Sequence, residues 1–522
     1  MSKNSILKGT LILTIAGFAT RIIGFFYRIF LSNLLKPEDM GVYQLIFPVY
    51  GICFTLYASG IQTSISRLIA AEIGKGNTRY LKKILRTGMF FSITIALTLS
   101  FFLNLNSSFI ATNILLESRC SGSLKILSYL FPFCGITACI NGYYYGIKRA
   151  GVPAMTQLFE QIIRVVSVYA LAPLFAVANS ERACELAVWG IVLGEIASNA
   201  YNIISMLFIK PSKIQAAYKL KIQSIRNRMA GQKKQVSFAG SLLKLAVPLT
   251  SNRLLIGILS SIEAILIPSM LREHGLSTAE ALSVYGVLTG MSIPFIMFPS
   301  TITNSFAVLL LPTVSEAQAA GNNNMIYKTA ALSMKYSLII GILSTGIFIT
   351  FGNSLGLIVF NNKAAGIFLT ILAWLCPFLY LTTTLSSILN GLGKPHVTFF
   401  NTVVGLSVRI AFVIIFVPKH GIWGYLIGML VSQVFISTLD TLAILRNIKI
   451  SFHAMDWIVK PGLITAFVGF LTNRSYLYIK EHSSMNGLLL LLSFCVFLVV
   501  CYVILLFITK AIRLEEFHRS KS

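Results

Sequence analysis

Long apolar segments alternate with short polar ones along the whole chain. Fourteen segments are apolar over roughly 17 to 28 residues, and a helix needs about 20 such residues to cross a bilayer. They lie at 8–31, 42–66, 86–106, 122–146, 154–177, 184–208, 241–267, 283–310, 330–351, 364–390, 397–417, 422–445, 457–473 and 486–509. The pattern predicts an all-α polytopic membrane protein with about 14 transmembrane helices.

Composition supports the same class. The chain has 522 residues, of which 56% are hydrophobic and 11% are charged, and its mean hydropathy is +0.78. These values exclude an ordinary soluble domain. Most of the eight cysteines lie inside apolar segments, and the sequence has no C-x-x-C pair and no Cys/His cluster. We therefore expect no disulfide framework, no metal site and no cofactor.

The basic residues predict the orientation in the membrane. With both termini in the cytoplasm, the cytoplasmic segments carry about 28 of the 43 Lys and Arg, and the external loops carry about nine. This bias fits the positive-inside rule. The basic segments that give the chain its net charge of +26 therefore suit contact with anionic membrane lipids better than binding of nucleic acid. The first apolar run continues past Arg21 without a convincing cleavage site, so we interpret it as an uncleaved first helix.

The longest polar stretch, 209–240, follows the sixth apolar segment and is strongly basic. Its scattered apolar residues would allow part of it to lie along the inner membrane surface. The simpler interpretation, which we favour, is a cytoplasmic linker between two halves of the protein.

The two halves resemble one another. The segment ILSYLFPF at 126–133 matches ILAWLCPF at 371–378, and the same shift of 245 residues carries Gly146 onto Gly391. Farther along, Trp189-Gly190 with Gly194 matches Trp423-Gly424 with Gly428 at a shift of 234. Because both halves start in the cytoplasm, the repeat is parallel, with a cleft expected between two similar lobes. We predict four parts: a six-helix lobe at 1–208, the linker at 209–240, a second six-helix lobe at 241–445, and two extra transmembrane helices with a basic tail at 446–522.

The first apolar segment carries two arginines in an unfavourable place. Arg21 and Arg28 are seven residues apart and share one helix face with Gly17 and Gly24. An arginine at the centre of a membrane helix costs on the order of 2.5–3.5 kcal/mol on insertion scales. We expect Arg21 to face a water-filled cavity, where it would be available to bind an anion. The alternatives are snorkelling to the headgroups for Arg28, and for Arg21 a buried ion pair with Glu160 or Glu263.

Carboxylates inside apolar segments are the second candidate chemistry. Glu160 is one turn before Arg164, a spacing that indicates a local ion pair. Glu195 and Glu263 also fall inside segments. An intramembrane carboxylate is a candidate site for a coupling ion, but with arginines nearby charge pairing is an equally good interpretation.

Several motifs resemble one family. The opening KGTLILTIAGFATRIIGFFYRIFLSNLL, the stretch at 43–77, and the turns GIKRAGVP and LNGLGKP are similar to the stage V sporulation protein B group. That group belongs to the polysaccharide branch of the multidrug/oligosaccharidyl-lipid/polysaccharide (MOP, MATE-like) superfamily, which includes the lipid II flippase. The resemblance implies a non-enzymatic flippase for undecaprenyl-pyrophosphate-linked glycans in a bacterial cytoplasmic membrane, with lipid II, for instance for spore cortex, as the leading substrate.

The resemblance also implies a substrate site. Arginines on the first, second and seventh-to-eighth helices of the lipid II flippase line its cavity, and the matching positions here are Arg21, Arg28, Arg67 and Arg253. Guanidinium groups suit the diphosphate of such a substrate. Arg67 also lies where the positive-inside rule alone would place a basic residue. The resemblance leaves cell-wall glycan polymerases open as protein partners.

Three other functions remain possible from sequence. A cation-coupled multidrug exporter of the related branch would be expected to line its cavity with acids, whereas the first helix here carries arginine. A membrane scaffold for cell-envelope glycan synthesis would give no reason for Arg21 within a span. A membrane enzyme finds no support in a nucleotide-binding loop or acidic metal motif.

Overall fold

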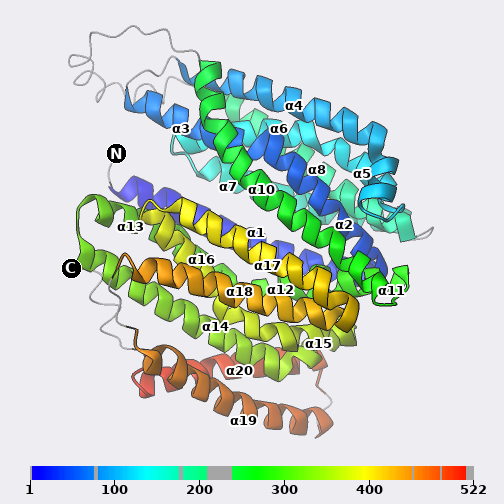
Figure 1. The fold of residues 1–522 in the computed structure, drawn as a ribbon, viewed down its shortest axis with the longest axis vertical. Coiled ribbons are helices and arrows are strands. Elements are labelled where there is room, and N and C mark those ends of the chain that lie inside the picture. Colours follow the sequence, from blue (N-terminus) through cyan, green and yellow to red (C-terminus); the bar gives the residue numbers. More distant parts are fainter. Residues whose placement is uncertain are drawn as a thin grey trace. The chain divides into compact units, whose positions relative to one another are not determined.

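The computed structural model describes residues 3–75, 80–175, 180–208, 238–448, 452–482 and 485–512, and every regular element among them is a helix (Figure 1). In hydrocarbon each backbone amide must bond within its own segment, so apolar sequence of this length folds as helices. The predicted linker lies outside the described residues from 209 to 237, and so does the basic tail from 513 to 522.

The prediction of a polytopic helical membrane protein is confirmed. Among the described residues, twelve helical segments are long and apolar enough to cross a membrane, and a thirteenth is the bent pair α5–α6, which turns by 44°. The remaining predicted segment, 154–177, corresponds to α7 (Gly151–Phe175), a 25-residue helix that carries an ion pair. Each of the fourteen apolar segments thus coincides with helical structure.

The chain divides into two compact units. Unit 1 comprises 1–27 and 42–265, and unit 2 comprises 28–41 and 266–522. Three helices contribute to both: α1 (Lys3–Leu34), α2 (Pro37–Phe54) and α10 (Phe238–Glu273). The lobes predicted from the sequence repeat, 1–208 and 241–445, assign α10 to the second lobe, and this division stays a prediction.

The remaining elements follow in chain order. Unit 1 contains η1 (Thr55–Ser59), α3 (Gly60–Gly74), α4 (Leu81–Phe109), η3 (Ile110–Ile114), α5 (Cys120–Ser128), α6 (Leu130–Gly146), α7 and α8 (Ser180–Phe208). Unit 2 contains α11 (Thr278–Gly286), η4 (Val287–Ser292), α12 (Ile293–Met297), α13 (Ser300–Ala319), α14 (Asn323–Phe360), α15 (Lys363–Leu372), η5 (Ala373–Leu375), α16 (Cys376–Gly391), α17 (Pro395–His420), α18 (Ile422–Leu445), η6 (Met455–Val459), α19 (Lys460–His482) and α20 (Gly487–Ile508).

The repeat reappears in how each unit packs. In unit 1, a Cβ at Gly194 of α8 would lie 2.8 Å from the Glu160 carbonyl oxygen of α7. In unit 2, a Cβ at Gly428 of α18 would lie 2.5 Å from the Phe412 Cβ of α17. These matched glycines let one helix approach its neighbour closely, as small residues do in membrane bundles. The two units therefore use equivalent helix pairs, α7–α8 and α17–α18.

A second matched pair of glycines links the helices that enclose each unit's apolar core. A Cβ at Gly146 would lie 2.7 Å from Ile69 Cβ, and a Cβ at Gly391 would lie 2.8 Å from Val314 Cβ. Ile69 belongs to an apolar cluster of α3, α4, α6 and α10, and Val314 belongs to one that includes α13, α14 and α16. The pseudo-symmetry predicted from sequence thus extends to the cores.

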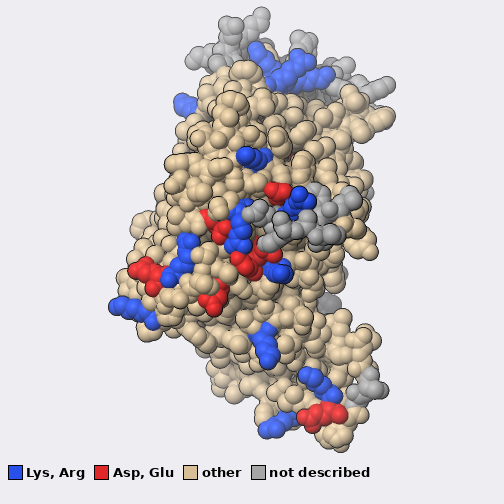
Figure 2. Space-filling view, turned by 90° about the vertical axis from the view of Figure 1, so that its right-hand side faces the viewer, with Lys and Arg blue, Asp and Glu red and all other residues tan. Residues whose placement is uncertain are grey.

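Much of the surface seen in Figure 2 carries no charge. Figure 2 shows broad areas without charge, between small groups of acidic and basic side chains. Large apolar side chains such as Phe101 on α4 and Phe467 on α19 are more than half exposed. Such surface would be a liability in water and is expected where lipid tails contact the protein.

Candidate substrate and ion sites

Arg21 has the open setting expected of a ligand-binding arginine. Its side chain is exposed and lies within the first candidate span, Ile15–Leu34. A Cβ at Gly17 would meet nothing within 4 Å, and one at Gly24 would meet only the Gln161 Oε1 atom at 3.8 Å. Among the side chains that the structure describes, Arg21 has no recorded hydrogen bond or ion pair. Its five N–H donors are available to an anion.

Arg253 is partly committed to the protein. Its Nη1 atom donates to the Ser59 carbonyl oxygen over 2.9 Å and also bonds the Ser59 hydroxyl. Ser59 ends the π-helical segment η1, where the hydrogen-bond register shifts from that of an α-helix. The Arg253 residue stays exposed, so the contact orients the guanidinium while leaving donors for a ligand.

The other two predicted substrate residues are also exposed. Arg67 lies on α3, and Arg28 lies two turns beyond Arg21 on α1. Arg28 takes part in an interaction within the protein, so it is not a free counterpart of Arg21. Three of the four predicted arginines, Arg21, Arg67 and Arg253, belong to unit 1, and Arg28 belongs to unit 2.

A charged cluster occupies the interior of unit 1. Arg164 donates through Nη2 to Glu160 Oε1, the local pair that the sequence spacing predicts, and their side chains are only 19% and 22% exposed. Glu160 is therefore paired with Arg164 and not with Arg21. Gly190 and Gly194 of α8 bring that helix against this pair. Glu195 follows Gly194 directly on α8, so the close approach of α7 and α8 places it near the Glu160–Arg164 pair.

Glu195 gives this cluster a second carboxylate. It is 6% exposed, its Oε1 atom has no recorded hydrogen-bond partner in the described structure, and it interacts electrostatically with Glu160 and Arg164. One turn later, Asn199 donates to the Phe133 carbonyl oxygen over 3.1 Å. Two carboxylates beside one guanidinium leave one excess negative charge, which a proton or a cation could neutralise. Glu263 of α10 is also buried, and it interacts with another group of the protein.

A fourth intramembrane acid, absent from the residues that the sequence singled out, lies in unit 2. Asp440 lies on α18 within the candidate span Ile422–Leu445 and is fully buried. Its Oδ1 atom accepts a 2.7 Å hydrogen bond from Asn401 Nδ2 of α17. Asp440 falls inside the predicted apolar segment 422–445, so its place within a span was a signal available from the sequence.

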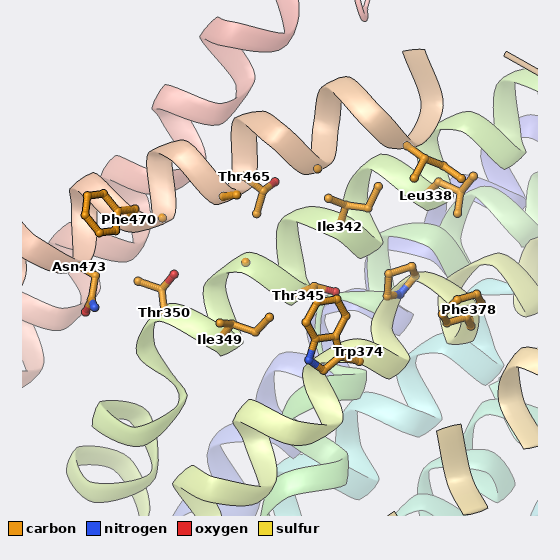
Figure 3. Close-up of a pocket in the computed structure, with 16 residues that line it drawn as sticks. Leu338, Ile342, Thr345, Ile349, Thr350, Trp374, Phe378, Thr465, Phe470 and Asn473 are labelled. Atoms are coloured by element: carbon orange, nitrogen blue, oxygen red, sulfur yellow. The ribbon is translucent and has the colours of Figure 1, made fainter. Parts of the chain in front are cut away.

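Unit 2 also contains an apolar cavity of about 550 Å³ (Figure 3). It lies between α14, the η5–α16 segment and α19, with Leu338 and Phe378 toward one end and Asn473 toward the other. Aliphatic and aromatic side chains such as Trp374 form most of its wall. A cavity of this chemistry suits a hydrocarbon chain better than a sugar or a phosphate.

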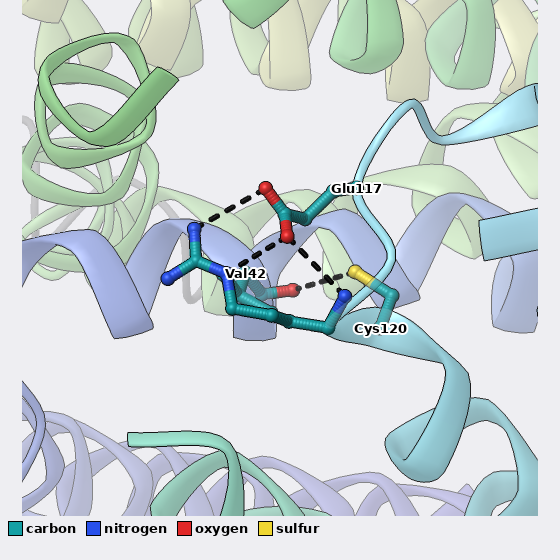
Figure 4. A network of polar contacts seen from close by, with 4 residues as sticks. Val42, Glu117 and Cys120 are labelled. Carbon is teal, nitrogen blue, oxygen red and sulfur yellow. Dashed lines mark hydrogen bonds and ion pairs between the residues drawn. The ribbon is translucent and has the colours of Figure 1, made fainter. Parts of the chain in front are cut away.

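A polar network stabilises the connection before α5 (Figure 4). Arg119 donates through Nε to Glu117 Oε1 over 2.8 Å and through Nη2 to Glu117 Oε2 over 3.2 Å, which is a bidentate ion pair. The Cys120 thiol points to the Val42 carbonyl oxygen at 3.7 Å. Because Glu117 is buried and fully engaged, we assign this network to structure and not to transport.

Comparison with known proteins places the chain in a family. Residues 6–318 match the family model described as polysaccharide biosynthesis protein. The chain belongs to this family. It is 25% identical to stage V sporulation protein B of Bacillus subtilis, over 99% of this chain and 98% of that protein. It is 21% identical to the lipid II flippase MurJ of the same organism, over 78% of this chain and 76% of that protein.

Solved structures agree on the fold. A lipid II flippase MurJ in an inward closed conformation superposes with a TM-score of 0.66 at 16% identity, covering 96% of this chain and 100% of that one. An inward-facing multidrug resistance MATE family transporter of the MOP superfamily gives a TM-score of 0.60 at 15% identity, covering 85% and 98%. At these identities the likeness concerns the fold alone, and it confirms the predicted MATE-like architecture.

Proposed function

We propose that this protein is a flippase that moves an undecaprenyl-pyrophosphate-linked glycan across the cytoplasmic membrane of a bacterium. The leading substrate is lipid II, and the likeness to stage V sporulation protein B favours a role in the spore cortex. The observation that carries the proposal is Arg21, an exposed arginine inside a membrane span of a polysaccharide biosynthesis family protein.

The chemistry of the substrate explains the arginines. The diphosphate is the part of a lipid-linked sugar that is most costly to move through hydrocarbon, because it is charged. A guanidinium stays protonated and can form two parallel hydrogen bonds to phosphate oxygens. Arg21 and Arg253 would hold the diphosphate, with Arg28 and Arg67 contributing positive potential along its path.

The lipid part of the substrate has a compatible site of its own. The apolar cavity between α14 and α19 is chemically suited to hydrocarbon. An exporter of free sugars would have no use for it. Transport would proceed by alternating access, as in other transporters built from repeats.

Orientation and partners complete the proposal. Both termini would lie in the cytoplasm, because that arrangement places most Lys and Arg on the cytoplasmic side. Anionic lipids would contact these basic segments. A cell-wall glycan polymerase would be the natural protein partner, because it consumes the flipped product.

Two alternatives remain as competing explanations. A multidrug exporter shares the fold, and the buried acids of unit 1 would suit its cations, but Arg21 would repel them. A scaffold that moves nothing would not be affected by loss of Arg21. Neither alternative expects a transport defect specific to anionic lipid-linked substrates.

The first experiment is a flipping assay. Purified protein in proteoliposomes with lipid II is compared with Arg21→Ala, and the substrate that becomes accessible on the opposite leaflet is measured. We expect protein-dependent flipping that the substitution lowers by about tenfold or more, since a hydrogen bond to a charged group is worth about 1.5–3 kcal/mol. No flipping of lipid II or of any other undecaprenyl-linked glycan would favour the scaffold.

A further inference from the structure

The α17–α18 hairpin of unit 2 buries one carboxylate that the transport scheme above does not use. Asp440 is 0% exposed, and its Oδ1 atom accepts the 2.7 Å hydrogen bond from Asn401. Its Oδ2 atom is also buried, and no hydrogen-bond partner for it is recorded within the described part of the chain. One oxygen of this carboxylate is thus satisfied, and the other is not.

Buried polar and apolar residues both flank Asp440 on α18, and Ser437, one turn earlier, is 3% exposed. Ile444, one turn later on α18, is fully buried in the cluster that contains Ile388 and Leu389 of α16. The helices packed against α18 are mainly α16 and α17, with smaller contacts from η5 and α15. Their charged and titratable residues, with those of α18 itself, are Lys363, Cys376, Tyr380, His396, Arg409, Lys419, His420 and Tyr425. Asp440 is in no recorded ion pair within the described ranges, whereas Arg409 and Tyr425 each take part in an interaction within the protein.

Basic groups stand near the end of the hairpin but are turned elsewhere. Lys394, which precedes α17, bonds the side chain of Asn447. Arg446, just past the end of α18, is exposed. Asp440 is five residues from the end of its span, or about 8 Å along the helix axis. The carboxylate therefore has no exposed surface in this structure, and the end of its candidate span is between one and two helical turns away.

A carboxylate in this setting needs a positive partner. Burial of an unpaired charge is expensive, and a buried ionisable group usually neutralises instead. Hard metal cations require a shell of several oxygen ligands, and Asn401 presents its N–H group, not its oxygen, to Asp440. A proton needs only the free Oδ2 atom, so the arrangement favours a proton over a metal ion.

The equivalent helix pair of unit 1 shows that packing alone does not demand this carboxylate. The 245-residue shift carries Thr156 of α7 onto Asn401. Thr156 donates through its hydroxyl to Asn202 Oδ1 of α8 over 2.7 Å, and both residues are buried. The 234-residue shift that relates α8 to α18 carries Asn202 onto Ile436, one turn before Asp440. The equivalent helix pair of unit 1 is thus joined by a neutral hydrogen bond, so that joining the two helices does not require an acid.

We propose that Asp440, positioned by Asn401, is a proton-binding site of unit 2 and that its protonation is linked to transport. The proton resides on Oδ2 while the hairpin is closed. It exchanges when α17 and α18 open toward the water at the end of the span. The link to transport rests on the proposed flippase activity, whereas proton binding at Asp440 does not.

Asp440→Asn is the decisive variant, because the new amide oxygen still accepts from Asn401 and the pair then resembles Thr156–Asn202. Asp456→Asn is the matched control, since Asp456 pairs with Lys460 over 2.5 Å at the start of α19. Infrared difference spectra of the purified proteins during a pH titration report protonated carboxyl groups. We expect one carboxyl band to disappear in Asp440→Asn and to persist in Asp456→Asn. An unchanged band in Asp440→Asn would overturn the assignment.

Flipping of lipid II then tests the link to transport. The wild-type rate should change about tenfold between about pH 6 and pH 8, and the Asp440→Asn rate should change less than about twofold. Asn401→Ser should move the midpoint to higher pH, because the charged carboxylate loses a donor that stabilises it. A purely structural role would lower melting temperature without moving that midpoint.

The outcomes separate the two proposals. If the wild-type protein flips no lipid II, the proposed function fails, and the infrared band still decides the proton site. If Asp440→Asn keeps the wild-type pH profile, the link to transport is wrong. A response of the band to sodium at constant pH would assign the site to a metal cation and overturn the proton assignment.

Discussion

Arg21 and Arg253 carry the same side chain in two different settings. Arg21 has an open helix face with glycines on either side, and Arg253 is fixed by the carbonyl and hydroxyl oxygens of Ser59. A fixed guanidinium loses little conformational freedom when it binds an anion, and an open one can follow a moving substrate. We therefore assign positioning of the diphosphate to Arg253 and a mobile contact to Arg21.

This difference predicts the effect of a conservative change. Arg253→Lys keeps the charge but loses the planar fork, so we expect flipping of lipid II to fall about tenfold, equivalent to about 1.4 kcal/mol. Ser59→Ala is the control, because the Ser59 carbonyl oxygen still accepts from Arg253. The effect of each variant is measured as the flipping rate of lipid II in proteoliposomes. Equal loss in the two variants would mean that Arg253 acts only as a bridge between α10 and η1.

The charged cluster of unit 1 gives a second prediction at the residue scale. Arg164→Ala removes the positive charge beside the buried Glu195 and the partly buried Glu160, and we expect it to destabilise the protein by about 3–5 kcal/mol. Glu195→Gln removes the excess charge, so stability should stay the same or rise. The stability of the Arg164→Ala and Glu195→Gln variants is measured as the melting temperature in detergent.

Glu273→Gln serves as the control for that series, because it is the same substitution at an exposed residue at the end of α10, and substitutions of exposed residues usually change stability by no more than about 0.5 kcal/mol. A large loss of stability in Glu195→Gln would show that the charge of Glu195 is paired by a group other than Arg164. Loss of flipping at unchanged stability would instead favour a coupling role for Glu195.

At the scale of elements, the matched glycines decide how closely helix pairs approach. We expect Gly194→Ala to destabilise the protein by about 1–3 kcal/mol, because its Cβ would lie 2.8 Å from a backbone oxygen that cannot move aside. Gly428→Ala should behave similarly in unit 2. Gly51→Ala is the control, since a Cβ there has no atom within 4 Å and alanine favours the helix by up to about 1 kcal/mol.

Melting temperatures of these three variants test whether the matched glycines are needed for close packing of the helix pairs. If Gly194→Ala and Gly51→Ala are equally stable, then close approach of α7 and α8 is not what the glycine provides. The comparison uses the same substitution at each site, so differences in side-chain size do not enter.

At the scale of the whole molecule, the distribution of charge predicts topology. A phosphatase fused after Ser277, between α10 and α11, should be active outside the cytoplasm, and one fused to the C-terminus should be inactive. A fluorescent protein that folds only in the cytoplasm should give the opposite pattern. The reverse result would invert the direction of transport that we propose.

The sequence by itself determined the membrane class, the helical segments and the internal repeat. These depend on local properties, since hydrophobic length and internal hydrogen bonding decide whether a segment spans a bilayer. The Glu160–Arg164 pair was also predictable, because its two residues are one helical turn apart. Family motifs added the substrate class and the arginines as candidates.

Contacts between helices distant in sequence were decided only by the tertiary structure. The bond from Arg253 to Ser59 spans 194 residues, and that from Asn401 to Asp440 spans 39. Helical periodicity gives the face of a helix but not the neighbour against which that face packs. The sequence places Asp440 within a span, but only the tertiary structure buries its carboxylate, and the cost of a charge depends on what surrounds it.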